Sequence, residues 1–193
     1  MMTKPDNKDF ILASGSAQRI RLLKQIGYTP KLICPADIDE SRLPHEDPLP
    51  YIRRVALSKA QAVATLHPQE NILSADTIIV VGKTIIQKSP DEDAQRKVMQ
   101  TLSGRTHRVI TSVCLISKDG HISQKTVTTK ICMKHLTAEE IEEYLQSGEW
   151  HGVCGYKIEG LLAAYVKKII GSYSGVVGLP LYETKNILNG NGI

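Results

Sequence analysis

The sequence contains few aromatic residues and lacks the cysteine and hydrophobic patterns that mark several protein classes. Phe and Trp occur once each and Tyr seven times in 193 residues, so few rings are available to stack on the bases of a single-stranded nucleic acid. The four cysteines form no C-x-x-C pair, which argues against a zinc site or a redox motif. No run of about 18 apolar residues occurs, and residues 1–9 are polar without the apolar core of a signal peptide, so we expect a cytoplasmic protein without a membrane-spanning helix.

Several catalytic signatures are also missing. The chain has neither the G-x-G-x-x-G pattern of dinucleotide-binding folds nor a P-loop, and its six histidines form no H-E-x-x-H pair. It has no G-x-S-x-G elbow of the kind found in many serine hydrolases.

The net charge of +4 suits a small polyanionic ligand, with plain solubility as the alternative, and is too low for a protein that coats nucleic acid. We therefore expect neither nucleic acid nor a membrane among its partners.

The hydrophobic pattern predicts strands that alternate with helices. One domain spanning 1–193 is expected, with 1–9 as a flexible polar N-terminus. Strands are expected at 10–13, 31–34, 71–81, 84–86, 107–117 and 121–129, with weaker candidates at 162–169 and 176–177. Helices are expected after Ser16, over 51–66, from Ser89-Pro90, from the capping box at Thr137, and from Leu181. Ser89 and Pro90 resemble a helix cap followed by a first helical residue. This alternation, with an internal hairpin, predicts an α/β fold with a mixed sheet.

A turn of small residues lies between the first strand and the first helix. The sequence Ser14-Gly15-Ser16 places backbone N–H groups and the positive end of the helix dipole where they could hold an anion, and Arg19 follows one turn later. The turn is thus a candidate phosphate site. The alternative is an ordinary serine cap at the start of a helix.

Asp76 is the most informative single residue because it interrupts an otherwise apolar strand. Burying a carboxylate there is costly unless it is paired or bound to a metal ion. A divalent cation shared with phosphates is one explanation, and a strand-end Asp that binds backbone groups is the other. The nearby acidic segment 37–40 could direct one or two carboxylates toward the same cation, or could simply be solvated.

Two lysines are candidates for phosphate contacts. Lys59 falls on the apolar stripe of the helix predicted over 51–66, where a cation needs an anionic partner or must extend its ammonium group to water. Lys88 follows a strand and precedes a helix, at an element end that could face a cleft. A solvated loop lysine is the alternative at that position.

Taken together, several segments resemble the Maf family of nucleoside triphosphate pyrophosphatases, from Ile11 to about Leu188. The resemblance rests on short motifs that occur in the family's order: Leu12-Ala13-Ser14-Gly15-Ser16 with Arg19, Ser58-Lys59-Ala60, Ala75-Asp76-Thr77, Leu102 to His107, Ser147-Gly148-Glu149, Tyr156 to Gly160, and Gly171-Ser172-Tyr173 through Pro180. Each motif is short, but their order is specific.

The resemblance implies an elongated mixed sheet flanked by helices, with two lobes around a central cleft. It also implies hydrolysis of ordinary or modified nucleoside triphosphates between the α and β phosphates with Mg²⁺ or Mn²⁺, by a protein that is often a homodimer. Carried over by position, it assigns catalytic roles to Asp76, Glu40, Lys59 and Lys88, metal binding to Asp76 and Glu40, and substrate binding to Ser14, Ser16, Arg19, Thr77 and Glu159. A competing hypothesis is a nucleotide-binding regulator of septum formation with little or no turnover.

The chain departs from the family pattern at several positions. Gln18 stands where an additional Arg is usual, Ser89 follows Lys88 in place of Pro, and the segment before Tyr156 is one residue short. Glu159 replaces the Gln of members that prefer thymidine and uridine triphosphates. Because an ionised carboxylate only accepts hydrogen bonds, we expect Glu159 to favour bases with N–H donors, such as guanine, unless it pairs with Lys157 or Arg19.

Overall fold

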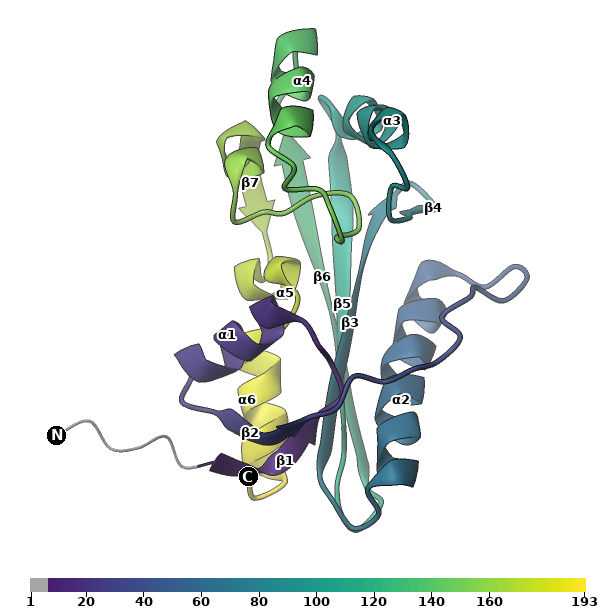
Figure 1. Cartoon of the computed structure of the whole chain (residues 1–193), viewed down its shortest axis with the longest axis vertical. Coiled ribbons are helices and arrows are strands. Elements are labelled where there is room, and N and C mark those ends of the chain that lie inside the picture. Colours follow the sequence, from purple (N-terminus) through teal and green to yellow (C-terminus); the bar gives the residue numbers. More distant parts are fainter. Residues whose placement is uncertain (1–6) are drawn as a thin grey trace, which may run out of the picture.

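Seven strands form one mixed sheet in the computed structural model of the chain, which describes residues 7–193 (Figure 1). The strands are β1 (Asn7–Leu12), β2 (Thr29–Ile33), β3 (Ile72–Val81), β4 (Thr84–Ile86), β5 (Thr106–Ile116), β6 (Ile122–Met133) and β7 (Val166–Ile170). Their order is β2-β1-β3-β5-β6-β7, and β4 pairs with β3. β1 runs parallel to β2 and β3, whereas the remaining pairs are antiparallel. The expectation of an α/β fold with a mixed sheet is confirmed.

Six α-helices within residues 7–193 surround this sheet. They are α1 (Ala17–Gln25), α2 (Pro48–Leu66), α3 (Glu92–Leu102), α4 (Ala138–Gln146), α5 (Tyr173–Val177) and α6 (Leu181–Gly190), with a 3₁₀ helix at Leu161–Tyr165. Figure 1 shows α2 on one side of the lower half of the sheet and α1 and α6 on the other, with α3 and α4 at the upper end. No helix in this part of the chain is both long enough and apolar enough to cross a membrane.

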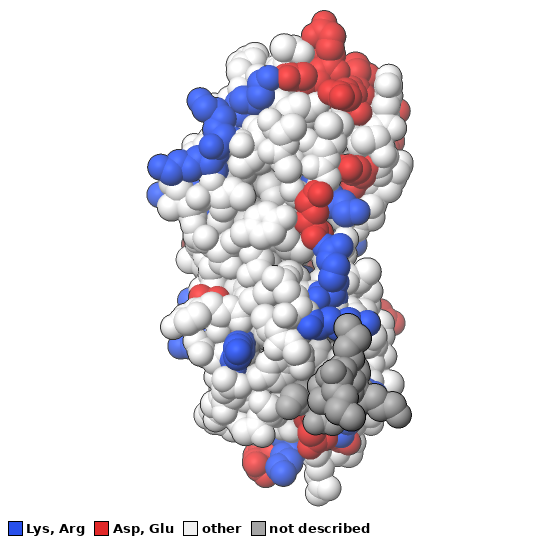
Figure 2. All heavy atoms as spheres, turned by 90° about the vertical axis from the view of Figure 1, so that its left-hand side faces the viewer, with Lys and Arg blue, Asp and Glu red and all other residues white. Residues whose placement is uncertain are grey.

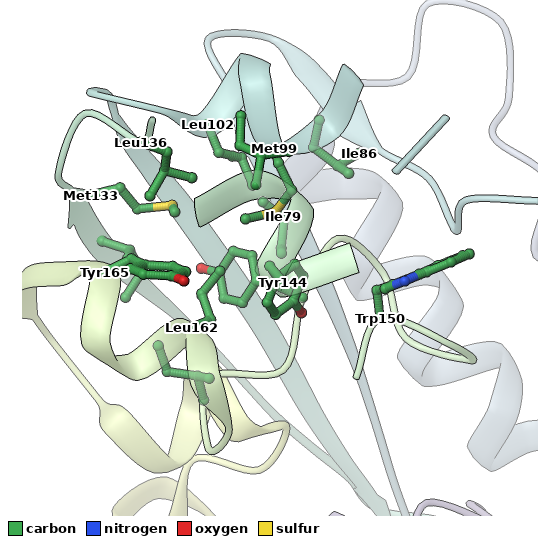
Figure 3. Close-up of a cluster of buried hydrophobic side chains, with 14 of the residues drawn as sticks. Ile79, Ile86, Met99, Leu102, Met133, Leu136, Tyr144, Trp150, Leu162 and Tyr165 are labelled. Carbon is green, nitrogen blue, oxygen red and sulfur yellow. The ribbon is translucent and has the colours of Figure 1, made fainter. Parts of the chain in front are cut away.

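The long strands β3, β5 and β6 run through both halves of the elongated molecule (Figure 1). In the lower lobe, α1 and α6 cover a cluster around Phe10 and Leu188, and α2 covers the opposite face of the sheet. In the upper lobe, a separate hydrophobic core gathers around Met99, Tyr144 and Leu162 (Figure 3). The implied elongated shape with two lobes is thus present.

Helix α2 begins three residues earlier than the sequence predicts. Pro48 and Pro50 precede the helix predicted over 51–66, but in the structure both lie in the first turn of α2, after Asp47. The first-turn N–H groups have no partner within a helix, so proline loses nothing there. Farther along, Ile52, Val55 and other residues at helical spacing are fully buried against the sheet.

The start of α3 and the C-terminal strand candidates need correction. Asp91, rather than Ser89, caps α3, because the Asp91 side chain accepts a hydrogen bond from the Ala94 N–H. The candidate at 162–169 divides into the 3₁₀ helix and β7. The candidate at 176–177 lies in α5, where the Ser172 hydroxyl caps the Gly175 N–H. The capping box at Thr137 is confirmed.

Part of the predicted flexible N-terminus belongs to the sheet. Residues 1–6 lie outside the described residues, but Asn7 to Asp9 are in β1, and Asn7 pairs with Thr29. The carbonyl of Asp9 accepts a hydrogen bond from the Asn71 side chain at 2.8 Å, and its carboxylate pairs with Lys31 at 2.7 Å. These contacts hold a polar segment in a strand that its composition does not favour.

A buried histidine lies in the upper half of the sheet. His107 Nε2 is 2.6 Å from the Tyr156 hydroxyl, whereas buried Nδ1 has no partner among the described residues. Burial lowers the pKa of His107 from 6.5 to about 4, because the charged imidazolium would lose its hydration. His107 is therefore neutral at pH 7.

Acid should destabilise the protein through this residue. The unfolded chain takes up a proton near pH 6.5 while the folded chain resists until about pH 4, so folding stability falls as pH drops through this interval, by about 3 kcal/mol. Urea unfolding at several pH values checks this. His107→Gln should flatten the dependence, whereas the exposed His121→Gln should not; equal slopes for the two variants would contradict it.

Candidate active site

A cleft of about 770 Å³ opens between the two lobes and is lined by residues from both. It contains all nine residues predicted as site residues: Ser14, Ser16, Arg19, Glu40, Lys59, Asp76, Thr77, Lys88 and Glu159. These residues come from the turn after β1, from α1, α2 and β3, and from three loops. The fold thus brings together positions up to 145 residues apart, from Ser14 to Glu159.

Asp76 and Lys59 form an ion pair at the centre of the cleft. Asp76 lies midway along β3, opposite Ser112 of β5, and Lys59 reaches it from α2 with Nζ 2.7 Å from Oδ1. Both side chains are largely buried, with exposed fractions of 13% and 12%. Each charge offsets the desolvation cost of the other. In the structure the strand carboxylate is therefore paired with a lysine, and the ammonium group of Lys59 stays inside the protein.

Glu40 joins the same lysine from the acidic loop. Its Oε1 lies 3.0 Å from Lys59 Nζ, and the Tyr51 hydroxyl donates a hydrogen bond to its carbonyl at 2.9 Å. Burial, followed by the nearby carboxylates, raises the pKa of Tyr51, so the phenol keeps the proton that it donates. Helix α2 therefore both carries Lys59 and positions Glu40.

A second contact anchors the acidic loop to α2. Arg54 binds both carboxylate oxygens of Glu46 at 2.7 Å and donates to the carbonyl of Ser41 at 3.0 Å. Two-pronged Arg–carboxylate contacts fix geometry as well as charge. Asp39, the other acidic candidate nearby, accepts a hydrogen bond from the Ser41 N–H instead of facing Lys59.

Arg19 ties three segments together at the lower edge of the cleft. Its guanidinium donates to the Ser14 hydroxyl at 3.0 Å, to the Gly178 carbonyl at 2.9 Å and to the Thr77 hydroxyl at 3.4 Å. The Ser16 hydroxyl caps α1 by accepting from the Arg19 N–H. Both readings of the serine turn are therefore compatible with the structure: it caps the helix, and it lines the cleft.

Two lysines of the cleft have no ion-pair partner among residues 7–193. Lys88 follows β4, and its backbone forms an isolated bridge with Cys154. Lys157 lies on the segment that carries Glu159 and lines the same cleft, although the sequence suggested it only as a partner of Glu159. Its position two residues before Glu159 was the available signal. Free ammonium groups in a cleft favour an anionic ligand.

Glu159 is held by a residue that the sequence analysis did not name. It pairs with Arg21 of α1, and not with Lys157 or Arg19. Its loop is shaped by Glu149, whose carboxylate accepts from the Leu161 N–H at 2.8 Å and leaves no room for a Cβ atom at Gly160. The motif residues Glu149 and Gly160 thus position the loop rather than line the cleft.

The carboxylates suit a cation that shares its coordination with the substrate. No group of three or more His, Cys, Asp or Glu side chains within residues 7–193 could enclose a metal ion by itself. Asp76 and Glu40, however, converge on one ammonium group. Magnesium typically uses one or two carboxylates together with water and substrate phosphates, so this pair fits Mg²⁺ or Mn²⁺ better than Ca²⁺.

Several known proteins are similar to this chain. A "dTTP/UTP pyrophosphatase" of Paramagnetospirillum magneticum is 48% identical over 94% of this chain and 96% of its own, and one of Rhodospirillum rubrum is 42% identical over 99% and 97%. Among solved structures, the Staphylococcus aureus Ham1 protein matches with a TM-score of 0.48 and 15% identity, covering 65% of this chain and 72% of its own.

The family comparison covers all the helices, the cleft and nearly all of the sheet. The model of the family described as Maf-like protein matches residues 9–191. The motifs noted in the sequence, from the serine turn to the C-terminal segment, lie within that match. The chain therefore belongs to the Maf family.

Proposed function

We propose that this chain is a nucleoside triphosphate pyrophosphatase that prefers thymidine and uridine triphosphates and works in the cleft between its lobes. Hydrolysis between the α and β phosphates would give a nucleoside monophosphate and pyrophosphate. The observation that carries the proposal is the convergence of Asp76 and Glu40 on Lys59 in a cleft that also contains unpaired lysines. The names of the relatives support the reaction and the choice of base.

The charges of the cleft suit the polyphosphate chain of such a substrate. Lys88 and Lys157 lack ion-pair partners among the described residues and are available to phosphate oxygens, whereas Arg19 contributes a fixed positive charge at the lower edge. Positive groups that are already in place stabilise the charge that develops during phosphoryl transfer. Lys59 can act in the same way once its carboxylate partners engage other groups.

Asp76 is the proposed base. Its carboxylate projects from the middle of a rigid strand, and Lys59 and the sheet hold its position. It can accept a proton from a water molecule that attacks phosphorus. A bound Mg²⁺ or Mn²⁺ would be held by Asp76 and Glu40, and it would supply charge neutralisation to the phosphates. Thr77, the next residue, lines the cleft and accepts a hydrogen bond from Arg19.

The proposed base preference revises the expectation from the sequence alone. A free Glu159 carboxylate would favour guanine, which presents two adjacent N–H donors. In the structure Arg21 engages one carboxylate oxygen, and relatives at 41–48% identity bear names that specify dTTP and UTP. These two observations favour a base with a single N–H donor.

The competing hypothesis of a regulator without turnover has no observation in its favour. Gln18 and Ser89 depart from the family pattern, but the cleft keeps the full set of predicted catalytic side chains.

On the face in Figure 2, the Lys and Arg residues lie in separate groups rather than in one basic surface of the kind that binds nucleic acid. The homodimer and the cytoplasmic location stay predictions, and light scattering tests the first.

Asp76→Asn should abolish hydrolysis while the fold is kept, because an amide of the same size is a poor metal ligand and no base. The measurement is pyrophosphate release from dTTP with Mg²⁺ and with Mn²⁺, together with thermal unfolding. Asp119→Asn, in the exposed turn between β5 and β6, is the matched control and should match the wild type. Substantial activity in Asp76→Asn would remove Asp76 from the catalytic site.

We expect lower kcat/KM values for dTTP in Lys59→Ala and in Lys88→Ala. Each loss should correspond to about 2 to 4 kcal/mol of transition-state stabilisation, the scale of one well-placed electrostatic donor. Lys83→Ala, at the exposed turn between β3 and β4, is the control and should have little effect. Unchanged kinetics for Lys88→Ala would return that residue to the role of a solvated loop lysine. Unchanged kinetics for Lys59→Ala would mean that its ion pairs serve structure alone.

A further inference from the structure

The ion pair between Arg21 and Glu159 joins a cleft residue to one outside the cleft. Glu159 lines the cleft and its side chain is 20% exposed, whereas Arg21 projects from α1, is 62% exposed and does not belong to the lining. The contact links Arg21 Nη2 to Oε1 of Glu159. Within residues 7–193, no side chain or backbone group donates to the other oxygen, Oε2.

The pair changes what Glu159 can offer to a ligand. A free carboxylate accepts through two equivalent oxygens and suits two donors side by side. With Oε1 engaged by Arg21, one oxygen remains for the cleft. A carboxylate oxygen accepts hydrogen bonds and has no proton to donate, so the remaining oxygen is an acceptor.

The geometry points to Arg21 as a specificity-determining residue that acts through Glu159. We infer that Arg21 converts the carboxylate into a single acceptor and so selects bases with one ring N–H donor. This inference rests on the proposed function and concerns the base end of the same site. Arg21 is a positioning residue, since it does not line the cleft itself.

The chemistry of the bases follows from this arrangement. Uracil and thymine present one ring N–H, at N3, flanked by carbonyl oxygens, so a single acceptor satisfies them. Cytosine presents an acceptor at N3, which a carboxylate oxygen repels. Guanine presents N1–H beside an N2 amino group, and a single acceptor leaves one donor unsatisfied. An unsatisfied donor in a binding site costs more than a hydrogen bond gains.

The distinction between thymine and guanine therefore depends on the ion pair rather than on Glu159 alone. In the absence of Arg21, both carboxylate oxygens become available and guanine gains a second hydrogen bond. Exposed ion pairs contribute little to folding stability, so replacing Arg21 should leave the fold intact. Replacing Arg21 should change the ratio of kcat/KM values between bases. The kcat/KM value for each base need not change by the same factor.

The test is a double-mutant cycle on the ratio of kcat/KM for dTTP to that for dGTP, measured by pyrophosphate release. Arg21→Met should shift the ratio toward dGTP by about tenfold, close to one hydrogen bond's worth of discrimination. Arg21→Lys should recover much of the preference, because lysine restores a cation at the same position. Lys24→Met, an exposed residue of the same helix, is the control and should keep the wild-type ratio.

The Glu159→Gln background separates positioning from a structural effect. There, Arg21→Met should change the ratio by no more than about twofold, since no carboxylate remains to be occupied. Two results would overturn the inference: Arg21→Met shifts the dTTP-to-dGTP ratio equally in the wild-type and the Glu159→Gln backgrounds, or it leaves the ratio unchanged when Glu159 is present. If the wild type releases no pyrophosphate from any of dTTP, UTP and dGTP, the proposed function itself fails.

Discussion

One ammonium group, Lys59 Nζ, connects the parts of the chain that build the cleft. It lies within 3.0 Å of carboxylate oxygens from the central strand β3 and from the acidic loop. Without this cation, the largely buried Asp76 carboxylate and the half-exposed Glu40 carboxylate would lie close together, and their repulsion would work against folding. With it, the loop that carries Glu40 is held against the sheet. The cost of burying Asp76 in a strand is thus offset by the residue that completes the site.

Much of this site could be predicted from the sequence because its residues break local patterns. A carboxylate within an apolar strand and a lysine on the buried stripe of a helix each demand a partner, and the structure pairs Asp76 with Lys59. Arg21 gives no such signal, because an exposed arginine on a helix is ordinary. Its contact with Glu159 spans 138 residues and depends on the position of the loop held by Glu149.

In the fold, too, features set by local sequence could be predicted, whereas features set by long-range contacts could not. The buried strands and the capping box at Thr137 are visible locally, since their hydrophobic runs and side-chain caps lie within a few residues. The apolar pair at 176–177 has strand propensity, yet it forms α5, because Ser172 caps that turn and the Thr111 hydroxyl binds its Gly175 carbonyl. Asn7 to Asp9 are polar, yet they belong to β1, which pairs with the edge strand β2. Tertiary contacts decided both cases.

The continuity of β3, β5 and β6 through both lobes limits how the protein can move. The pairing of β5 with β6 runs without a register shift from Thr106 to Ile116. A hinge motion that separates the two lobes would therefore bend a continuous ladder of backbone hydrogen bonds. Domain-closing enzymes instead place flexible segments between their moving parts. Entry and exit of a nucleotide must therefore depend on the loops at the cleft rim, and the exchange rate should respond to their anchors, such as Arg54, more than to the packing of either lobe.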